Sequence, residues 1–275
     1  MADGATQPRH QVKPGNKLAH ATAENSPLVK GRREFFRYRD LGVKDASGGL
    51  VKAQIISAIT GMTEPTGWHY HTCEAQFVYI KKGWVDLEFE DGQRKRVKAG
   101  ESLFIPGGMK HNEFGTSDDL EILEVVLPSE MGTVPCEQPD RAAANPLVKA
   151  GNKLAHATEE SAPFVKGRRE FFKYRDLGVM DASGGQVRAQ IMTAVRGMDM
   201  ETGWHYHTCE AQFAHILKGW VDLEFEDGSR KRVKAGEALF IPGGLKHNEI
   251  ATSDNLEALE IVLPSEMGTI PCERP

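Results

Sequence analysis

The sequence predicts an all-β protein built from two tandem barrels of the jelly-roll type. The first observation is an internal repeat: residues 13–139 and 149–275 align without a gap at an offset of about 136 positions, with roughly three residues in four identical. The second is a series of short strand-like segments separated by Gly, Pro, Asp and Ser. Many short strands with turns between them are typical of β-sandwiches and β-barrels. Each copy is long enough to bury a core of its own.

Strand-like segments recur along the whole of the first copy. Between residues 85 and 89, Val85, Leu87 and Phe89 alternate with acidic residues, and Asp91-Gly92 follows as a hairpin turn. This alternation predicts an antiparallel strand with one buried face. Only residues 16–23 look even weakly helical. The other expected strands are 34–38, 51–60, 74–80, 94–97, 102–105 and 121–127.

The repeat also sets the expected domain organisation. We expect an N-terminal barrel over residues 1–139, a linker over 140–148 and a C-terminal barrel over 149–275. Because the linker is short, the two barrels should pack against each other as a pseudo-dimer within one chain. That pseudo-dimer could itself pair into a homodimer.

Composition excludes several classes of protein. The net charge of −5 and the pI near 6.1 give no electrostatic reason to bind nucleic acid or an anionic membrane. Nowhere does the chain approach the roughly 18 consecutive apolar residues that a membrane helix needs. The 4 cysteines form no CxxC pair and no disulfide framework, which fits a reducing compartment. We therefore expect a cytoplasmic protein whose partner is a small molecule.

Histidine carries the chemical information in this sequence. His69 and His71 are two residues apart, so on a strand both imidazoles leave the same face and can converge on one ion. Gln76 follows at the start of the next apolar run, and His111 comes just after a Gly-rich turn. Three imidazoles and one amide oxygen could therefore meet in each copy. The candidate metal ligands are His69, His71, Gln76, His111, His205, His207, Gln212 and His247.

These residues resemble the two conserved motifs of the cupins, and specifically of the two-domain bicupins. The first motif is Gly, five residues, His-x-His, three or four residues, Glu, six residues and Gly; the second is Gly, five residues, Pro-x-Gly, two residues, His, three residues and Asn. The chain departs from them at three positions of the first copy, where Thr63, Gln76 and Gly115 replace Gly, Glu and Asn. The matching residues are His69, His71, Gly83, Gly100, Pro106, Gly108 and His111, then His205, His207, Gly219, Gly236, Pro242, Gly244 and His247.

The resemblance implies a double-stranded β-helix barrel around one divalent transition metal in each domain. Iron, nickel or manganese in an octahedral site would keep about two open positions, whereas tetrahedral zinc would be closed unless the glutamine stays off the ion. Because Gln76 and Gln212 are neutral where the family has glutamate, the ion should be a stronger Lewis acid and should accept an anionic substrate. By resemblance, the activity is of the isomerase, lyase or cyclase type, or that of a dioxygenase. The alternative is a binding protein without enzymatic activity that holds a metabolite or metal for sensing or storage.

Two pairs of residues leave their roles open. Gln76 and Gln212 could hydrogen-bond near the metal without touching it. Glu74 and Glu210 could replace them as ligands or act as general bases, but a surface carboxylate at a strand entry is at least as compatible with their position.

The two copies differ on the strand that follows the glutamine. Tyr79 becomes His215 and Val78 becomes Ala214. Strand alternation places residue 78 on the face of Gln76 and residue 79 on the opposite face. We therefore expect a larger pocket in the second copy, and we expect His215 to be an interface or sheet-packing residue rather than a ligand. Since every candidate ligand occurs in both copies, we expect two metal-competent sites.

Overall fold

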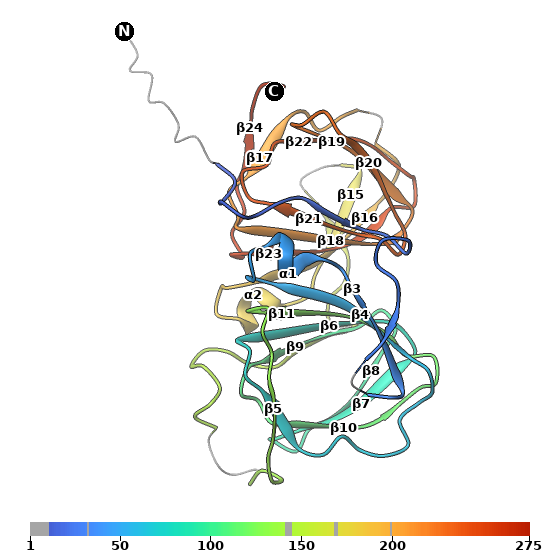
Figure 1. Cartoon of the computed structure of the whole chain (residues 1–275), viewed down its shortest axis with the longest axis vertical. Coiled ribbons are helices and arrows are strands. Elements are labelled where there is room, and N and C mark those ends of the chain that lie inside the picture. Colours follow the sequence, from blue (N-terminus) through green and yellow to red (C-terminus); the bar gives the residue numbers. More distant parts are fainter. Residues whose placement is uncertain (1–10, 32, 141–144, 168–169, 199) are drawn as a thin grey trace.

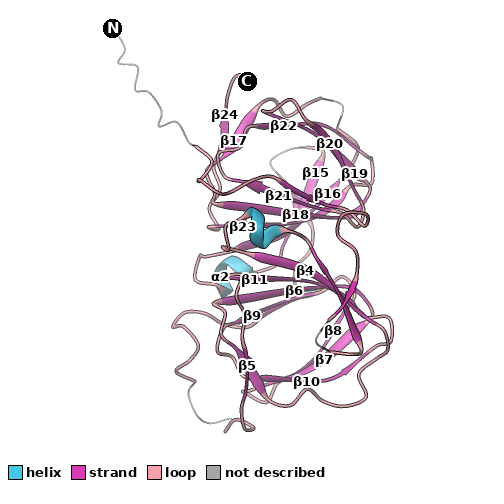
Figure 2. Cartoon of the chain, viewed as in Figure 1, coloured by secondary structure: helices cyan, strands magenta, loops and turns pink. Residues whose placement is uncertain are grey.

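Two β-barrels stacked along the long axis of the molecule make up the computed structural model (Figure 1). It describes residues 11–31, 33–140, 145–167, 170–198 and 200–275. Of the expected linker, residues 141–144 lie outside this described part. Apart from the two short helices α1 (Val43–Ala46) and α2 (Val179–Ala182), the regular elements of the described chain are strands (Figure 2). The expected all-β class with two jelly-roll barrels is confirmed. No helix in the described ranges combines the length and the apolar character needed to cross a membrane.

The first barrel consists of a seven-stranded and a five-stranded antiparallel sheet. Its strands are β2 (Val29–Lys30), β3 (Phe36–Asp40), β4 (Lys52–Ala58), β5 (His69–His71), β6 (Ala75–Lys82), β7 (Trp84–Phe89), β8 (Arg94–Lys98), β9 (Ser102–Pro106), β10 (His111–Thr116), β11 (Glu121–Leu127), β12 (Thr133–Pro135) and, from the second repeat, β13 (Ala155–Ala157). The larger sheet has the order β13-β9-β6-β11-β4-β3-β2 and the smaller β12-β5-β10-β7-β8. The expected buried face of β7 is present, with Val85, Leu87 and Phe89 all buried, but Glu88 on the opposite face is buried as well.

The second barrel repeats this arrangement. Its strands are β1 (Ala19–Ala21), from the first repeat, then β14 (Val165–Lys166), β15 (Phe172–Asp176), β16 (Arg188–Ala194), β17 (His205–His207), β18 (Ala211–Lys218), β19 (Trp220–Phe225), β20 (Arg230–Lys234), β21 (Ala238–Pro242), β22 (His247–Thr252), β23 (Glu257–Leu263) and β24 (Thr269–Pro271). The seven-stranded sheet has the order β1-β21-β18-β23-β16-β15-β14, and the five-stranded sheet β20-β19-β22-β17-β24.

The first strand of each repeat belongs to the barrel of the other repeat. β1 pairs with β21 of the second barrel, and β13 pairs with β9 of the first. Both exchanges carry a histidine–glutamate contact: His20 Nε2 lies 2.8 Å from Glu237 Oε2, and His156 Nε2 lies 2.9 Å from Glu101 Oε2. The weak helical expectation for residues 16–23 is therefore wrong, because pairing with a distant edge strand outweighs local propensity there.

The seven-stranded sheets of the two barrels share one apolar core, and both short helices lie between the barrels (Figure 1). The first repeat contributes Phe77, Tyr79, Phe104 and Leu123, among others, and the second contributes Phe213, Phe240, Leu259 and Ile261. Because this core joins residues of both repeats, the barrels form one packed unit, as expected for a pseudo-dimer.

Strand β6 separates this shared core from the interior of the first barrel. Tyr79 is part of the shared core, whereas Val78 and Ile80 pack inside the barrel. Its counterpart His215 on β18 is fully buried and is influenced by the charges of Lys81 and Arg39, which come from the first repeat. Of the two positions expected for His215, interface or sheet packing, the structure thus favours the interface.

Candidate metal centres

Three histidines converge inside the first barrel. His69 and His71 are the end residues of β5, and β10 begins at His111, which pairs directly with His69. The ring centroids of His69 and His111 are 4.5 Å apart, and those of His71 and His111 are 5.1 Å apart. All three side chains are buried, and one ligand atom of each lies within 4.8 Å of the others. The two-residue spacing therefore places both imidazoles on one face of the strand, as the sequence predicts.

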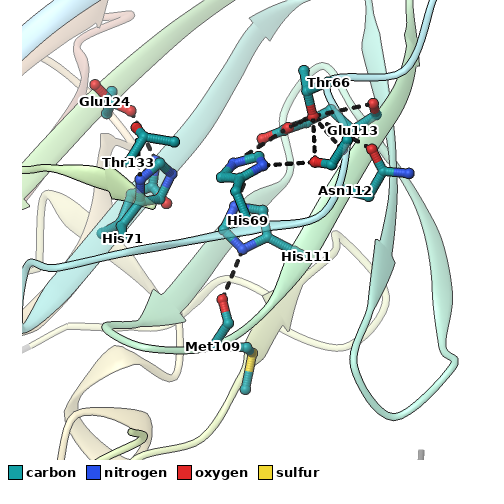
Figure 3. Close-up of polar contacts among 11 residues, drawn as sticks. Thr66, His69, His71, Met109, His111, Asn112, Glu113, Glu124 and Thr133 are labelled. Carbon is teal, nitrogen blue, oxygen red and sulfur yellow. Dashed lines mark hydrogen bonds and ion pairs between the residues drawn. The ribbon is translucent and has the colours of Figure 1, made fainter. Parts of the chain in front are cut away.

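The backbone fixes how two of these rings point. His69 Nδ1 lies 2.9 Å from the carbonyl oxygen of Gly67, and His111 Nδ1 lies 2.9 Å from that of Met109 (Figure 3). A carbonyl oxygen can only accept, so each Nδ1 carries the proton and donates, and each Nε2 keeps its lone pair. His111 Nε2 is buried and has no hydrogen-bond partner among the described residues. Such a set of free imidazole nitrogens fits a transition-metal ion.

The second barrel contains the same arrangement. His205, His207 and His247 bring their ligand atoms within 4.8 Å of one another. His205 Nδ1 lies 2.8 Å from the carbonyl oxygen of Gly203, and His247 Nδ1 lies 2.9 Å from that of Leu245. His247 Nε2 is again buried without a partner in the described part of the chain. Both repeats thus assemble a triad suited to one divalent metal.

Burial keeps these rings neutral. It lowers the pKa of His71 to about 4 and that of His207 to about 3, with further lowering by the neighbouring histidines of each triad. Burial likewise lowers the pKa of His111 and of His247. A neutral imidazole is the form that binds a metal, so these four rings are ready to do so at neutral pH.

A carboxylate orients the glutamine in each barrel. Gln76 Nε2 donates to Glu124 Oε1 at 2.8 Å, and Gln54 Nε2 donates to Glu124 Oε2 at 2.5 Å. Gln76 Oε1 is left buried without a hydrogen-bond partner among the described residues. The reverse amide orientation would face two oxygens toward each other, so this hydrogen bond determines the rotamer. Gln212 and Glu260 repeat the contact at 2.8 Å. The amide oxygen therefore stays available to a cation.

A second carboxylate lies against the triad. Glu113 is two residues beyond His111 on β10, and its Oε1 is 3.7 Å from His111 Nε2. Its other oxygen, Oε2, is 3.7 Å from His69 Nε2. Thr66 Oγ1 donates to Oε2 at 2.5 Å (Figure 3). In the second barrel Glu249 Oε2 lies 3.6 Å from His205 Nε2.

The other candidate acids lie elsewhere. Glu74 and Glu210 are exposed, and their partners belong to the opposite repeat. Gln186 Nε2 donates to Glu74 at 3.5 Å, and Lys13 Nζ lies 3.8 Å from Glu210. The structure brings neither acid into the buried histidine cluster.

A cavity of about 880 Å³ fills the interior of the second barrel and reaches its triad. His205, His207, Gln212 and Glu249 line the metal end. Ala214 lines it too, as expected from its position on the face of Gln212. Its further walls are mostly apolar, formed by Phe172, Met192, Met198, Ile216, Val221, Leu223, Val233, Leu239, Ile241, Leu256 and Ala258.

A comparison with protein families assigns both repeats to one family. The model described as a cupin domain matches residues 60–126 and 194–262, and each match contains one complete histidine triad. The chain is a two-domain cupin. The search of curated proteins found no match.

Solved structures similar to this cupin include several of oxalate decarboxylase from Bacillus subtilis. A tryptophan-to-tyrosine variant is 12% identical, with a TM-score of 0.64 over 92% of this chain and 79% of that one. A structure of that enzyme at pH 4.6 is 11% identical, with a TM-score of 0.64 over 92% of this chain and 78% of that one. A third, from work on its Mn(II) centers, is 12% identical, with a TM-score of 0.63 and coverages of 92% and 79%. At these identities the likeness is one of fold.

Sequence reasoning missed Glu113 and Glu249 in this cupin. The family motif directs attention to position 76 for an acidic residue and leaves the residue two places after the third histidine unexamined. The signal was present nonetheless: the rule that puts His69 and His71 on one face also puts Glu113 on the face of His111. The run His-Asn-Glu occurs in both copies.

Proposed function

We propose that this protein is a metal-dependent enzyme that acts on a small organic acid, with one divalent transition-metal ion in each barrel. The observation that carries the proposal is the buried, unpartnered Nε2 of the third histidine in both triads. In the second barrel the other two histidines, His205 and His207, line a cavity large enough for an organic molecule. Bound by His69, His71, His111 and Gln76, and by their counterparts in the second barrel, the ion would supply Lewis-acid chemistry or, if it is iron, redox chemistry.

The charges around the second cavity support an anionic substrate. Arg188 and Lys166 line it together with Glu249, Glu260 and Glu266. Two cations against three carboxylates become a net positive site once a divalent ion is bound. Arg188 Nε is buried and has no hydrogen-bond partner among the described residues, and its Nη2 is 4.0 Å from Glu260. Arg188 is therefore placed to bind a substrate carboxylate, and the reacting end of the substrate would lie toward the histidines.

The apolar walls of the cavity support an organic acid with an apolar body. They surround the space beyond the histidines, so a substrate with hydrocarbon there gains about 25 cal/mol for each Å² of apolar surface that it buries. The similar solved structures are named oxalate decarboxylase. Oxalate is thus the first compound to test, although a cavity of about 880 Å³ has room for a larger acid.

Metal content tests the first half of the proposal. We expect freshly purified protein to carry about two equivalents of a transition metal per chain, and the variant His69→Ala/His205→Ala to lose most of it, because each triad loses one of its three imidazoles. Elemental analysis of both proteins is the measurement. Wild-type protein that is metal-free and does not take up iron, nickel, manganese or zinc would contradict the proposal.

Turnover tests the second half. Oxygen uptake with diketones and catechols separates a dioxygenase from reactions that consume no oxygen. These are decarboxylation of oxalate and of aryl carboxylic acids, and isomerisation or lysis of unsaturated uronates, all assayed in air. The same acids are titrated into metal-loaded protein by calorimetry. Binding of an acid without turnover of any compound would replace the enzyme with the alternative, a cupin that holds a metabolite for sensing or storage.

A further inference from the structure

We propose that Glu113 and Glu249 are direct ligands of the two metal ions, so that each site takes its carboxylate from the strand of the third histidine. This proposal rests on the metal-binding part of the proposed function. The family motif has its glutamate at the positions of Gln76 and Gln212. The proposal places the acidic ligand at a different position, two residues after the third histidine.

The separations between the side chains favour ligation. Two ligand atoms about 2.0–2.1 Å from one ion lie roughly 3.0 Å apart at a right angle and about 4.2 Å apart when opposite each other. The 3.7 Å from Glu113 Oε1 to His111 Nε2 and the 3.7 Å from Oε2 to His69 Nε2 fall inside this range. So does the 3.6 Å between Glu249 Oε2 and His205 Nε2. One ion can therefore contact the carboxylate together with His69 and His111 in the first barrel, and together with His205 in the second.

The carboxylate is held in place before any ion arrives. Besides donating to Glu113 Oε2, the Thr66 hydroxyl accepts the backbone N–H of Glu113 at 3.2 Å. The backbone N–H of Thr66 donates to the carbonyl oxygen of Glu113 at 2.8 Å. Thr202 makes the same three contacts with Glu249. Hydrogen bonds that fix a ligating carboxylate are a regular feature of metal sites.

Charge supplies an independent reason. The side-chain partners of the Glu113 carboxylate among the described residues are Thr66, His69 and His111, and none of them is a lysine or arginine. A carboxylate withdrawn from water is costly unless a positive charge or hydrogen bonds compensate it, and none of these three side chains carries a fixed positive charge. A divalent ion between the carboxylate and the imidazoles provides one.

The register of β10 is consistent with this role. The pairing of β10 with β7 shifts between Glu113 and Gly115, and that of β22 with β19 shifts at the corresponding place after Glu249. Such a bulge changes the direction of nearby side chains and is common beside functional sites. Because the bulge occurs in both repeats, Glu113 and Glu249 face their triads in the same way. Ligation would return the negative charge that Gln76 and Gln212 remove from the usual cupin donor set.

The test measures the affinity of metal-free, full-length protein for Mn(II) by anaerobic calorimetry, together with the electron paramagnetic resonance spectrum of the bound ion. The variant is Glu113→Gln/Glu249→Gln, which keeps size and removes charge. Its matched control is Glu24→Gln/Glu160→Gln, the same change at an exposed pair of equivalent positions. A further variant, Thr66→Val/Thr202→Val, removes the hydroxyl group that holds each carboxylate but keeps the carboxylate itself.

We expect the dissociation constant of the glutamate variant to rise by more than the roughly 10–100-fold that the loss of a supporting residue costs, and the spectrum of any bound Mn(II) to change. The dissociation constant of the threonine variant should rise by an amount within that 10–100-fold range. The dissociation constant of the control should equal that of the wild type. If the glutamate variant does not fold, Glu113→Asp/Glu249→Asp replaces it, with weaker binding and a changed spectrum expected. An unchanged spectrum with a rise below tenfold would overturn the ligand assignment. Wild-type protein that binds no metal would instead sink the proposed function.

Discussion

The two barrels carry the same candidate metal ligands around different interiors. Val78 and Ile122 of the first barrel become Ala214 and Ala258 in the second, and both alanines line the large cavity. The surroundings of the metal change with them: Gln76 is buried at 7% exposure, whereas its counterpart in the second barrel is only partly buried. The candidate metal ligands and the side chains that set the size of the interior are thus different residues. The two copies share the first set and differ in the second.

Refilling the second cavity should have the largest effect on function. The variant Ala214→Val/Ala258→Ile gives the second barrel the side chains of the first. We expect it to bind metal normally and to lose about 100-fold in kcat/KM for the organic acid, or about 2.7 kcal/mol, since the added methyl groups occupy the space of the substrate. Steady-state kinetics and elemental analysis are the measurements.

The reciprocal change is the control for this experiment. Val78→Ala/Ile122→Ala trims the first barrel and should cost on the order of 2–5 kcal/mol of unfolding free energy, because these side chains fill a packed interior. It should leave turnover in the second barrel unchanged. If filling the second cavity has no effect on kinetics while the reciprocal variant abolishes turnover, substrate binds in the first barrel.

The fold could be predicted from the sequence wherever its determinants were local. Alternation predicted β7 with Val85 and Leu87 buried, and the repeat extended each strand prediction to the second copy. The exchanged strand β1 could not be found in this way. Its partner in β21 lies more than 200 residues away, and its His20–Glu237 contact depends on how the two barrels pack. Such non-local pairing leaves no periodic signal in three residues.

Arg188 provides a narrower way to test the difference between the barrels. The first barrel has Lys52 at this position. Arg188→Lys keeps the charge and removes the planar pair of donors that binds a carboxylate through two hydrogen bonds, so we expect KM to rise about tenfold with kcat little changed. The matched control is Lys52→Arg, which should leave both constants as they are. An unchanged KM in Arg188→Lys would show that the guanidinium does not bind the acid.

The site was predictable to the extent that strand geometry alone defines it. The two-residue spacing of His69 and His71 was sufficient to place two ligands, and the motif located His111. Glu113 follows from the same spacing, but the family motif assigned the acid to position 76. The cavity was harder to predict. Ala214 was visible as a difference between the repeats, whereas Ala258 joins the same wall only once β18 and β23 are paired.

The smallest effect that we predict comes from the interface between the two barrels, where His215 occupies the place of Tyr79. Neither ring nitrogen of His215 has a hydrogen-bond partner among the described residues. Burial, with the charges of Lys81 and Arg39, lowers its pKa to about 3. An unfolded chain protonates this histidine near its usual pKa of 6.5, so acid favours the unfolded state, and stability is lost as the pH falls from 6.5 toward 3.

The variant His215→Tyr should remove this contribution to the pH dependence. We expect the wild type to lose about 1 kcal/mol more unfolding free energy than the variant between pH 6.5 and pH 5.5. Urea unfolding of both proteins at the same metal loading measures the difference. Tyr79→Phe serves as the control, because burial and Glu257 raise the pKa of Tyr79 to about 12 and its hydroxyl does not titrate in this range. Identical pH curves for the wild type and His215→Tyr would mean that His215 is hydrated or paired when the protein folds in solution, and the asymmetry between the barrels would then be confined to their interiors.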